Sequence, residues 1–198
     1  MRRTVLCLAL SFLLASLSWA GKTVQITEVG KDRIESDFPS GGSLKMSLCS
    51  SGVEVRGTDE AKIRVSYHSR EDTSRVKVRL QSSGKEGSLE VDNCPHEDFR
   101  ITVEVPRLAH LHIRMFAGEL DVEGIEGNKD LELSFGELDV HLGKAESYAH
   151  VEASVTTGEV DGRPFNVNKG GFFRSFEREG TGKYRLHAHV GAGQVSIN

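Results

Sequence analysis

The stretch Met115–Gly124, MFAGELDVEG, is nearly repeated as LSFGELDVHL at Leu133–Leu142, and a looser copy, VTTGEVDGRP, follows at Val155–Pro164. In each copy, residues that alternate between apolar and polar lead to a glycine, and a second alternating run follows it. Such alternation is typical of strands with one buried face. Glycine reaches backbone angles that suit a corner. The stretch therefore predicts a unit of strand, glycine corner and strand.

The same unit can be aligned on two further glycines, Gly52 and Gly193. The middle glycines Gly118, Gly136 and Gly158 are 18 and 22 residues apart, and the last step of 35 residues, to Gly193, is near two units. Such a period is expected when each unit is one coil that buries its apolar face only by stacking on the next. The sequence therefore predicts an all-β fold, either a short β-solenoid or a sandwich derived from such coils.

The segment ahead of this array has longer alternating runs: AKIRVSYHS, TSRVKVRLQSS, GSLEVDN and DFRITVEVP, the last of which ends at Pro106. These runs predict a few longer strands joined by turns, and we expect them to pair antiparallel. No stretch rich in Pro or Ser separates them from the repeat array, which we place at about residues 107–198. We therefore predict a single β domain over residues 21–198.

Residues 1–20, MRRTVLCLALSFLLASLSWA, are typical of a secretory signal peptide cleaved after Ala20. No later segment approaches the roughly 18 apolar residues of a membrane helix, so we expect no transmembrane segment in the mature chain. Without Arg2 and Arg3 the formal net charge of −4 becomes −6. Because nucleic acid binding needs a basic face, this charge argues against such a partner. The mature protein is expected to be periplasmic, on the cell surface or secreted.

Two cysteines, Cys49 and Cys94, remain after this cleavage. An even pair in an oxidising compartment suggests one disulfide, and the alternative is two small buried thiols. The sequence leaves both open, because it does not show whether the two Cα atoms approach within the roughly 7 Å that a bridge tolerates.

The order of GSLKMSLCSSGVEVRGTDEAKIRV, ITVEVPRLAHLHIRMFAGELDVEGIEGNKDLELSFGELDV and VEASVTTGEVDG, closed by GKYRLHAHVGAGQVSIN, resembles the bacterial putative-adhesin family. That family is a domain of unknown function that repeats a Ser/Thr-Gly-Asp/Glu-aliphatic-x-Val unit. The resemblance covers about Val24–Asn198, and it implies an exported, β-solenoid-like envelope domain with no established catalytic residues. The chain departs from the pattern at Ala117 and Phe135, where the family usually has Ser or Thr before the corner glycine.

Acidic residues flank the aliphatic position of each repeated stretch and point outward, since successive side chains of a strand alternate faces. If the coils stack in register, the acids form two columns, one of Glu119, Glu137 and Glu159 and one of Asp121, Asp139 and Asp161. A surface for Ca²⁺ or a basic partner is one interpretation, because hard cations take several carboxylate oxygens. We favour the other interpretation, a solvated face that resists aggregation.

The segment Gly170–Arg185, GGFFRSFEREGTGKYR, interrupts the repeat and concentrates aromatic and basic residues. Its candidates for stacking on sugar rings or binding a partner are Phe172, Phe173, Arg174 and Phe176. A solenoid must also cover its open end, and we favour the interpretation that this segment is such a cap.

Eight histidines raise the question of a metal site. His110 and His112 share one strand face, and His187 and His189 share another. A zinc site needs three or four converging ligands, and the sequence contains no HExxH motif. We therefore predict plain surface histidines, no metal site and no cofactor apart from the Ca²⁺ alternative above.

Catalytic signatures are missing from the sequence, which has no GxSxG motif, no P-loop and no complete GxGxxG motif. We therefore predict a non-enzymatic, adhesin-like domain that contacts envelope proteins or glycans. Its oligomeric state stays open. The alternative is a polysaccharide-acting lyase or hydrolase on a β-solenoid scaffold, which a cleft holding a carboxyl with a strongly shifted pKa would favour.

Overall fold

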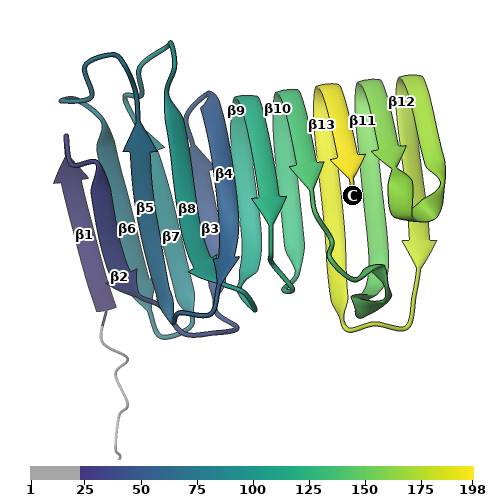
Figure 1. Ribbon diagram of the computed structural model, residues 1–198, viewed down its shortest axis with the longest axis horizontal. Helices are drawn as coiled ribbons and strands as arrows, with labels where there is room; N and C mark the ends of the chain where they lie inside the picture. The colour runs from purple at the N-terminus through teal and green to yellow at the C-terminus, as the bar shows by residue number, and fades with distance from the viewer. Residues whose placement is uncertain (1–22) are drawn as a thin grey trace, which may run out of the picture.

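The computed structural model describes residues 23–198, so the predicted signal peptide at residues 1–20 lies outside the described residues. The regular structure of these residues is a single mixed sheet of 13 strands, with two short 3-10 turns (Figure 1). The predicted all-β class is confirmed. Over the same residues, none of the regular elements is a helix with the length and apolar character to cross a membrane.

Eight short strands come first in the chain and five long strands follow. The short strands are β1 (Thr23–Val29), β2 (Arg33–Asp37), β3 (Ser43–Leu48), β4 (Ser51–Thr58), β5 (Lys62–His68), β6 (Lys77–Ser83), β7 (Glu86–Asp92) and β8 (Arg100–Pro106). The long strands are β9 (His110–Glu123), β10 (Lys129–Val140), β11 (Tyr148–Gly162), β12 (Val167–Glu179) and β13 (Tyr184–Ile197). The 3-10 turns η1 (Ala145–Ser147) and η2 (Arg163–Phe165) lead into β11 and β12.

Each long strand bends once, at a glycine with positive φ. These corner glycines are Gly118, Gly136, Gly158, Gly171 and Gly193, with φ between +121° and +144°. Residues with a side chain rarely adopt such angles. Adjacent corners also approach closely, since a Cβ on Gly136 would collide with the carbonyl oxygen of Gly118, and a Cβ on Gly193 with that of Gly136. The backbone angle therefore favours glycine at all five corners, and a close backbone oxygen also demands it at Gly118, Gly136, Gly158 and Gly193.

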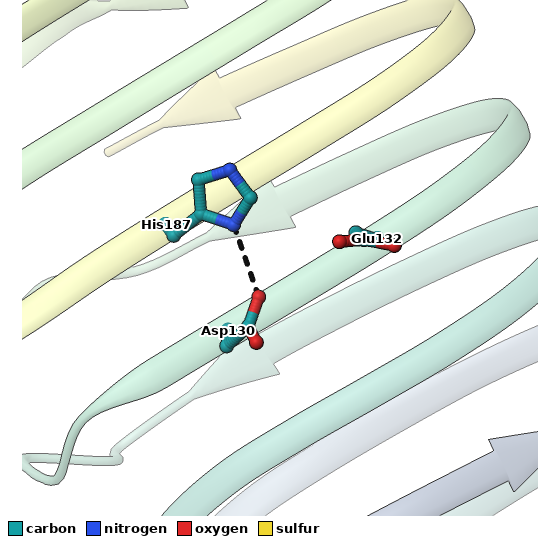
Figure 2. Close-up of side chains that lie close together, drawn as sticks. All are labelled: Asp130, Glu132 and His187. Carbon is teal, nitrogen blue, oxygen red and sulfur yellow. Dashed lines mark hydrogen bonds and ion pairs between the residues drawn. The ribbon is translucent and has the colours of Figure 1, made fainter.

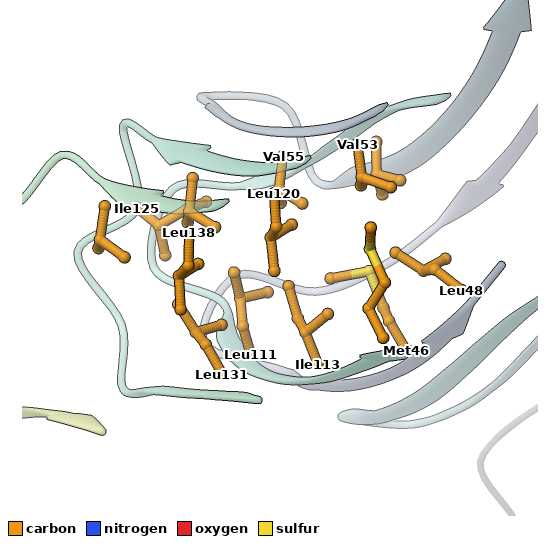
Figure 3. Packing of buried hydrophobic residues seen from close by; sticks show 14 of the residues in the cluster. Met46, Leu48, Val53, Val55, Leu111, Ile113, Leu120, Ile125, Leu131 and Leu138 are labelled. Carbon is orange, nitrogen blue, oxygen red and sulfur yellow. The ribbon is translucent and has the colours of Figure 1, made fainter. Parts of the chain in front are cut away.

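The bends fold the sheet into two facing walls. The first wall consists of β1, β6, β7 and β3 and the limbs of the long strands that continue from β3. The second wall consists of β2, β5, β8 and β4 and the limbs of the long strands that continue from β4. Figure 3 shows apolar side chains from the two walls meeting between them. Leu111 and Ile113 come from one wall, Leu120 and Val55 from the other, and all four are buried. The core is thus a layer between the walls.

The four runs that precede the array pair as expected. β5 pairs antiparallel with β8, and β6 pairs antiparallel with β7. They join the long strands through parallel pairs, β3 with β7 and β4 with β8. The N-terminal part is therefore a two-layered arrangement of separate strands, and the C-terminal part is built of bent strands that belong to both walls.

The order of the long strands differs from the expected stacking along the chain. β13 lies between β10 and β11 and pairs parallel with both, whereas β12 pairs antiparallel with β11 and is the last strand of the order. The bent strands carry similar apolar faces and corners, so a strand far along the chain fits between two earlier ones. The first unit is also offset from its predicted alignment, because Ser51, not Gly52, pairs with Gly118.

Cys49 and Cys94 form a disulfide whose Cα atoms are 6.2 Å apart. The bond joins the residues that follow β3 and β7, two adjacent strands of the first wall. The suggested bridge is confirmed, and the alternative of two free thiols is wrong.

Candidate functional site

The acidic residues of the repeated stretches lie on the outer face of the second wall. Glu119 stands directly beside Glu137 on the neighbouring strand. The predicted column ends there, because Gln194 of β13 stands between Glu137 and Glu159 of β11. The aspartate column of Asp121, Asp139 and Asp161 is interrupted in the same way by Ser196. The expectation of two continuous columns was wrong, because it assumed that the coils stack in chain order.

The structure instead gathers the acids of β9 and β10 beside Glu54 of β4, which lies next to Asp121. Sequence reasoning missed Glu54 because it aligned the first unit on Gly52. An alignment of Val53 with Leu120, which pair in the structure, places Glu54 at the position of Asp121.

A depression of about 420 Å³ lies over these acids and is also lined by Arg100 and Thr102. Burial raises the pKa of the Asp121 carboxyl, against the opposing effect of His141, and the neighbouring acids raise it further. The Oδ1 atom of Asp121 is buried and accepts no hydrogen bond, and His141 Nε2 lies 3.5 Å from it. The depression therefore holds one carboxyl group that resists ionisation more than a free aspartate does.

A second candidate surface runs along the corner between the walls, where four large aromatic side chains are exposed. These are Phe116 (65% exposed), Phe135 (51%), Phe172 (69%) and Phe173 (81%). Phe116 and Phe135 pack edge to face on β9 and β10, with ring centroids 5.4 Å apart. Phe172 and Phe173 lie on β12, at the far end of the same corner. Sequence reasoning missed the first pair, although an aromatic residue precedes the glycine in both MFAG and LSFG.

Small residues separate the two aromatic pairs. Phe135 stands beside Ala192, Ala192 beside Thr157, and Thr157 beside Phe172. The two pairs are therefore three strand spacings apart, roughly 14 Å. A depression of about 500 Å³ lies over Gly191, Ala192 and the adjacent threonines, against the rings of Phe116 and Phe135. We call the whole corner surface, from Phe116 and Phe135 across this depression to Phe172 and Phe173, the corner groove.

The predicted aromatic segment is an ordered part of the sheet. Phe173 has a φ of +49°, an unfavourable angle for a bulky side chain, and Arg174 Nε donates a hydrogen bond to the Gly170 carbonyl oxygen at 2.9 Å. Phe176 is buried and packs on Phe165, with ring centroids 5.6 Å apart. The prediction that Phe176 offers a binding surface was therefore wrong. The place of β12 at the end of the sheet agrees with the cap interpretation.

A third candidate surface lies on the outer face of the first wall, where histidines and carboxylates stand on adjacent strands. His112 of β9, Asp130 of β10 and His187 of β13 occupy one row across the sheet. The Nδ1 atom of His187 lies 3.0 Å from Asp130 Oδ1 (Figure 2). The Nδ1 atom of His112 lies 2.7 Å from Asp130 Oδ2. One carboxylate thus contacts two imidazole rings.

Glu132 adds a second carboxylate, two residues further along β10 and on the same face. Arg114 bonds both acids, with Nη2 3.0 Å from Asp130 Oδ2 and Nε 2.9 Å from Glu132 Oε2. Partial burial opposes ionisation of Asp130, but hydrogen bonds from Arg114 and His187 outweigh it and hold its pKa at about 2. Asp130 is therefore ionised over the physiological pH range. Sequence reasoning identified the histidine pairs but not these acids, which meet them only across strands.

Comparison with known proteins adds one structural likeness. No protein-family model matches the chain, and no curated protein does. The chain is similar to the crystal structure of a "putative cell adhesion protein from Clostridium sporogenes ATCC 15579", with a TM-score of 0.51 and 14% sequence identity over 89% of this chain and 99% of the other. At this level of identity the likeness shows the fold alone.

Proposed function

We propose that this chain is an exported, non-enzymatic adhesion domain that binds a neutral glycan in the corner groove. One observation carries the proposal: two pairs of exposed phenylalanines stand on either side of a floor of small residues. Exposed apolar groups gathered in this way mark interaction sites on soluble folds. The description of the structural neighbour as a "putative cell adhesion protein" supports the same role.

The chemistry of the groove suits sugar rings, which present apolar C–H faces and polar rims. The rings of Phe116 and Phe135 offer apolar surface at the wall. Ser134 and Thr156, which also line the depression, offer hydroxyl groups that donate and accept hydrogen bonds. Glu132 lies in the same lining, where it is paired with Arg114, and no Lys or Arg among residues 23–198 lines the depression to attract an acidic glycan. A neutral glycan therefore fits better than a polyanion.

The disulfide supports the exported location. Disulfides persist in oxidising compartments and are rare in the cytosol, and the structure has one between Cys49 and Cys94, two half-buried residues that pack against the core. This agrees with the signal peptide predicted at residues 1–20. We infer that the domain works outside the cytoplasm, in contact with glycans or glycosylated proteins of the cell envelope.

The test is binding of the purified protein to immobilised neutral and acidic oligosaccharides. We expect saturable binding to a neutral glycan that falls at least tenfold in Phe116→Ala and in Phe135→Ala, because each change removes a stacking surface. Val29→Ala is the matched control: Val29 is also an exposed apolar residue, but it lies on β1 at the opposite end of the sheet. Failure to bind any neutral glycan, or equal binding by Phe135→Ala, would contradict the proposal.

A polysaccharide-acting hydrolase or lyase is the second candidate, and the raised pKa of Asp121 favours it. Glycosidases use one carboxyl group that stays protonated beside another that is ionised, and Asp139 stands next to Asp121 in the acidic depression. Cleavage of a polysaccharide by the wild-type protein, lost in Asp121→Asn and retained in Phe135→Ala, would support an enzyme. Absence of cleavage with retained binding supports the adhesion domain.

A further inference from the structure

We propose that the outer face of the first wall carries a site for a divalent transition metal ion of the zinc class, with Asp130, Glu132 and His187 as its ligands. One ligand atom from each residue lies within 4.8 Å of the other two. Figure 2 shows the three side chains projecting from the neighbouring strands β10 and β13. A single ion can therefore reach all three with small side-chain adjustments.

The donor set selects the class of metal. An imidazole nitrogen with two carboxylates suits Zn²⁺ and related first-row ions, whereas Ca²⁺ and Mg²⁺ prefer oxygen ligands alone. All three ligands stand on strands that are paired on both sides, β10 between β9 and β13, and β13 between β10 and β11. Their backbones are thus fixed before any ion arrives, which lowers the entropy cost of binding.

Neighbouring side chains support the ligands. His112 contacts Oδ2 of Asp130 whereas His187 contacts Oδ1, and a second partner of this kind orients a carboxylate as outer partners do in known metal sites. His189 stands beside Glu132 in the sheet, and its Nδ1 lies 2.9 Å from Ser154 Oγ. The ligands therefore lie among further histidines on the same face of the sheet.

The carboxylates of Asp130 and Glu132 already bind one cationic group, the guanidinium of Arg114. Its guanidinium group bonds both carboxylates of the proposed site. A divalent ion carries twice the charge and approaches oxygen to about 2.0–2.2 Å, so it competes well for the same oxygens. Arg114 then acts as a competitor, and its removal should tighten metal binding.

The proposed site is partly open to solvent. Three protein ligands leave a fourth position of a tetrahedral ion for water or for a donor from a bound molecule. A second group, His150 with Glu177 and Glu179, has similar spacing. Its acids lie on the end strand β12 and are more exposed than Asp130 and Glu132. We therefore assign the ion to the group on the central strands and use His150 as a comparator.

The experiment is a calorimetric titration of the purified protein with Zn²⁺ alone, repeated with Ca²⁺ and Mg²⁺. We expect saturable binding of Zn²⁺ at the proposed site. We expect no binding of Ca²⁺ or Mg²⁺ at Asp130 and Glu132. His187→Gln and Glu132→Gln should each weaken this site at least tenfold, because each removes one of three ligands. His150→Gln is the matched control and should leave it unchanged. Arg114→Gln should tighten it severalfold.

A tetrahedral Co²⁺ absorption spectrum, lost in His187→Gln, would report the ligand set directly. His187 and Glu132 are partly exposed, so thermal melts without metal should match the wild-type protein and exclude unfolding as the cause of any loss. The proposal is overturned if the wild-type protein shows no saturable Zn²⁺ binding or if His187→Gln binds as well as wild type. It also fails if His150→Gln abolishes the site or Arg114→Gln weakens it.

Discussion

Lys129 is a buried basic residue at the start of β10, in the first wall. Its Nζ donates hydrogen bonds to the Tyr148 hydroxyl and to the Gly127 carbonyl oxygen, the latter at 3.3 Å. Burial lowers the pKa of Lys129 from 10.5 to about 7, against the opposing effect of Glu126, and it raises the pKa of Tyr148. The Lys129 amine is therefore harder to protonate in the folded protein than in the unfolded chain.

This residue makes stability depend on pH. The unfolded chain keeps the Lys129 proton up to about pH 10.5, whereas the folded chain loses it near pH 7. Between these values the unfolded state binds more protons, so raising the pH favours folding, by up to about 1.4 kcal/mol per pH unit. We predict that Lys129→Met removes this slope and makes the protein more stable at pH 7, where the cost of the buried charge is still largely present.

Urea unfolding followed by circular dichroism at pH 7.5 and pH 9.5 checks the prediction. Lys45→Met, which changes an exposed lysine of the same wall, is the control and should keep the wild-type slope. Equal slopes in the wild-type protein and Lys129→Met would show that Lys129 is not the group responsible.

Among the elements, β13 and β12 have opposite surroundings although they follow each other in the chain. β13 is hydrogen-bonded to β10 on one side and β11 on the other. β12 is bonded to β11, and in the described part of the chain no strand pairs with its other edge. Most β12 side chains are exposed, whereas the inward side chains of β13, such as Leu186 and Val190, are fully buried.

We predict that β13 is among the slowest elements to exchange its amide hydrogens, because it is hydrogen-bonded to a strand on each side. Exchange reports local opening, and opening β13 breaks two ladders at once, whereas β12 can separate from β11 alone. Hydrogen exchange with mass spectrometry should show at least tenfold slower exchange for residues 184–197 than for residues 167–179. Comparable rates in the two segments would contradict the inserted position of β13.

At the scale of the whole molecule, the Cys49–Cys94 disulfide restricts the conformations of the unfolded chain. It joins residues 45 positions apart in the sequence, and a crosslink of that span restricts the unfolded ensemble far more than the folded state. The bond lies where the chain leaves β3 and β7, close to its passages from the first wall to β4 and β8 of the second. It therefore ties together the ends of two adjacent strands of the first wall, where both chain segments cross to the second.

We predict that the double variant Cys49→Ser/Cys94→Ser loses about 2–4 kcal/mol of unfolding free energy. Urea titrations with and without a thiol reductant measure this loss. The reductant should destabilise the wild-type protein by a similar amount and leave the double variant unchanged, which is the control. If the reductant destabilised both proteins equally, the loss of unfolding free energy would not come from breaking the Cys49–Cys94 bond.

Sequence reasoning identified part of the candidate surfaces. Phe172 and Phe173 were candidates from their composition, and both are exposed. Phe116 was missed because its exposure beside a floor of small residues depends on which strands follow β10 in the sheet. Asp130 was missed because its imidazole partners lie on two other strands, 18 and 57 residues away in sequence.

The sequence by itself determined the all-β class, the alternation of buried and exposed side chains, the glycine corners and the two cysteines available to form a bridge. These features are local, because the pleat of a strand and the backbone angles of glycine act within a few residues. Only the tertiary structure decided the strand order. Bent strands with similar faces are interchangeable neighbours, so the packing of the whole chain placed β13 between β10 and β11. That placement interrupted the acidic columns and brought His187 to Asp130.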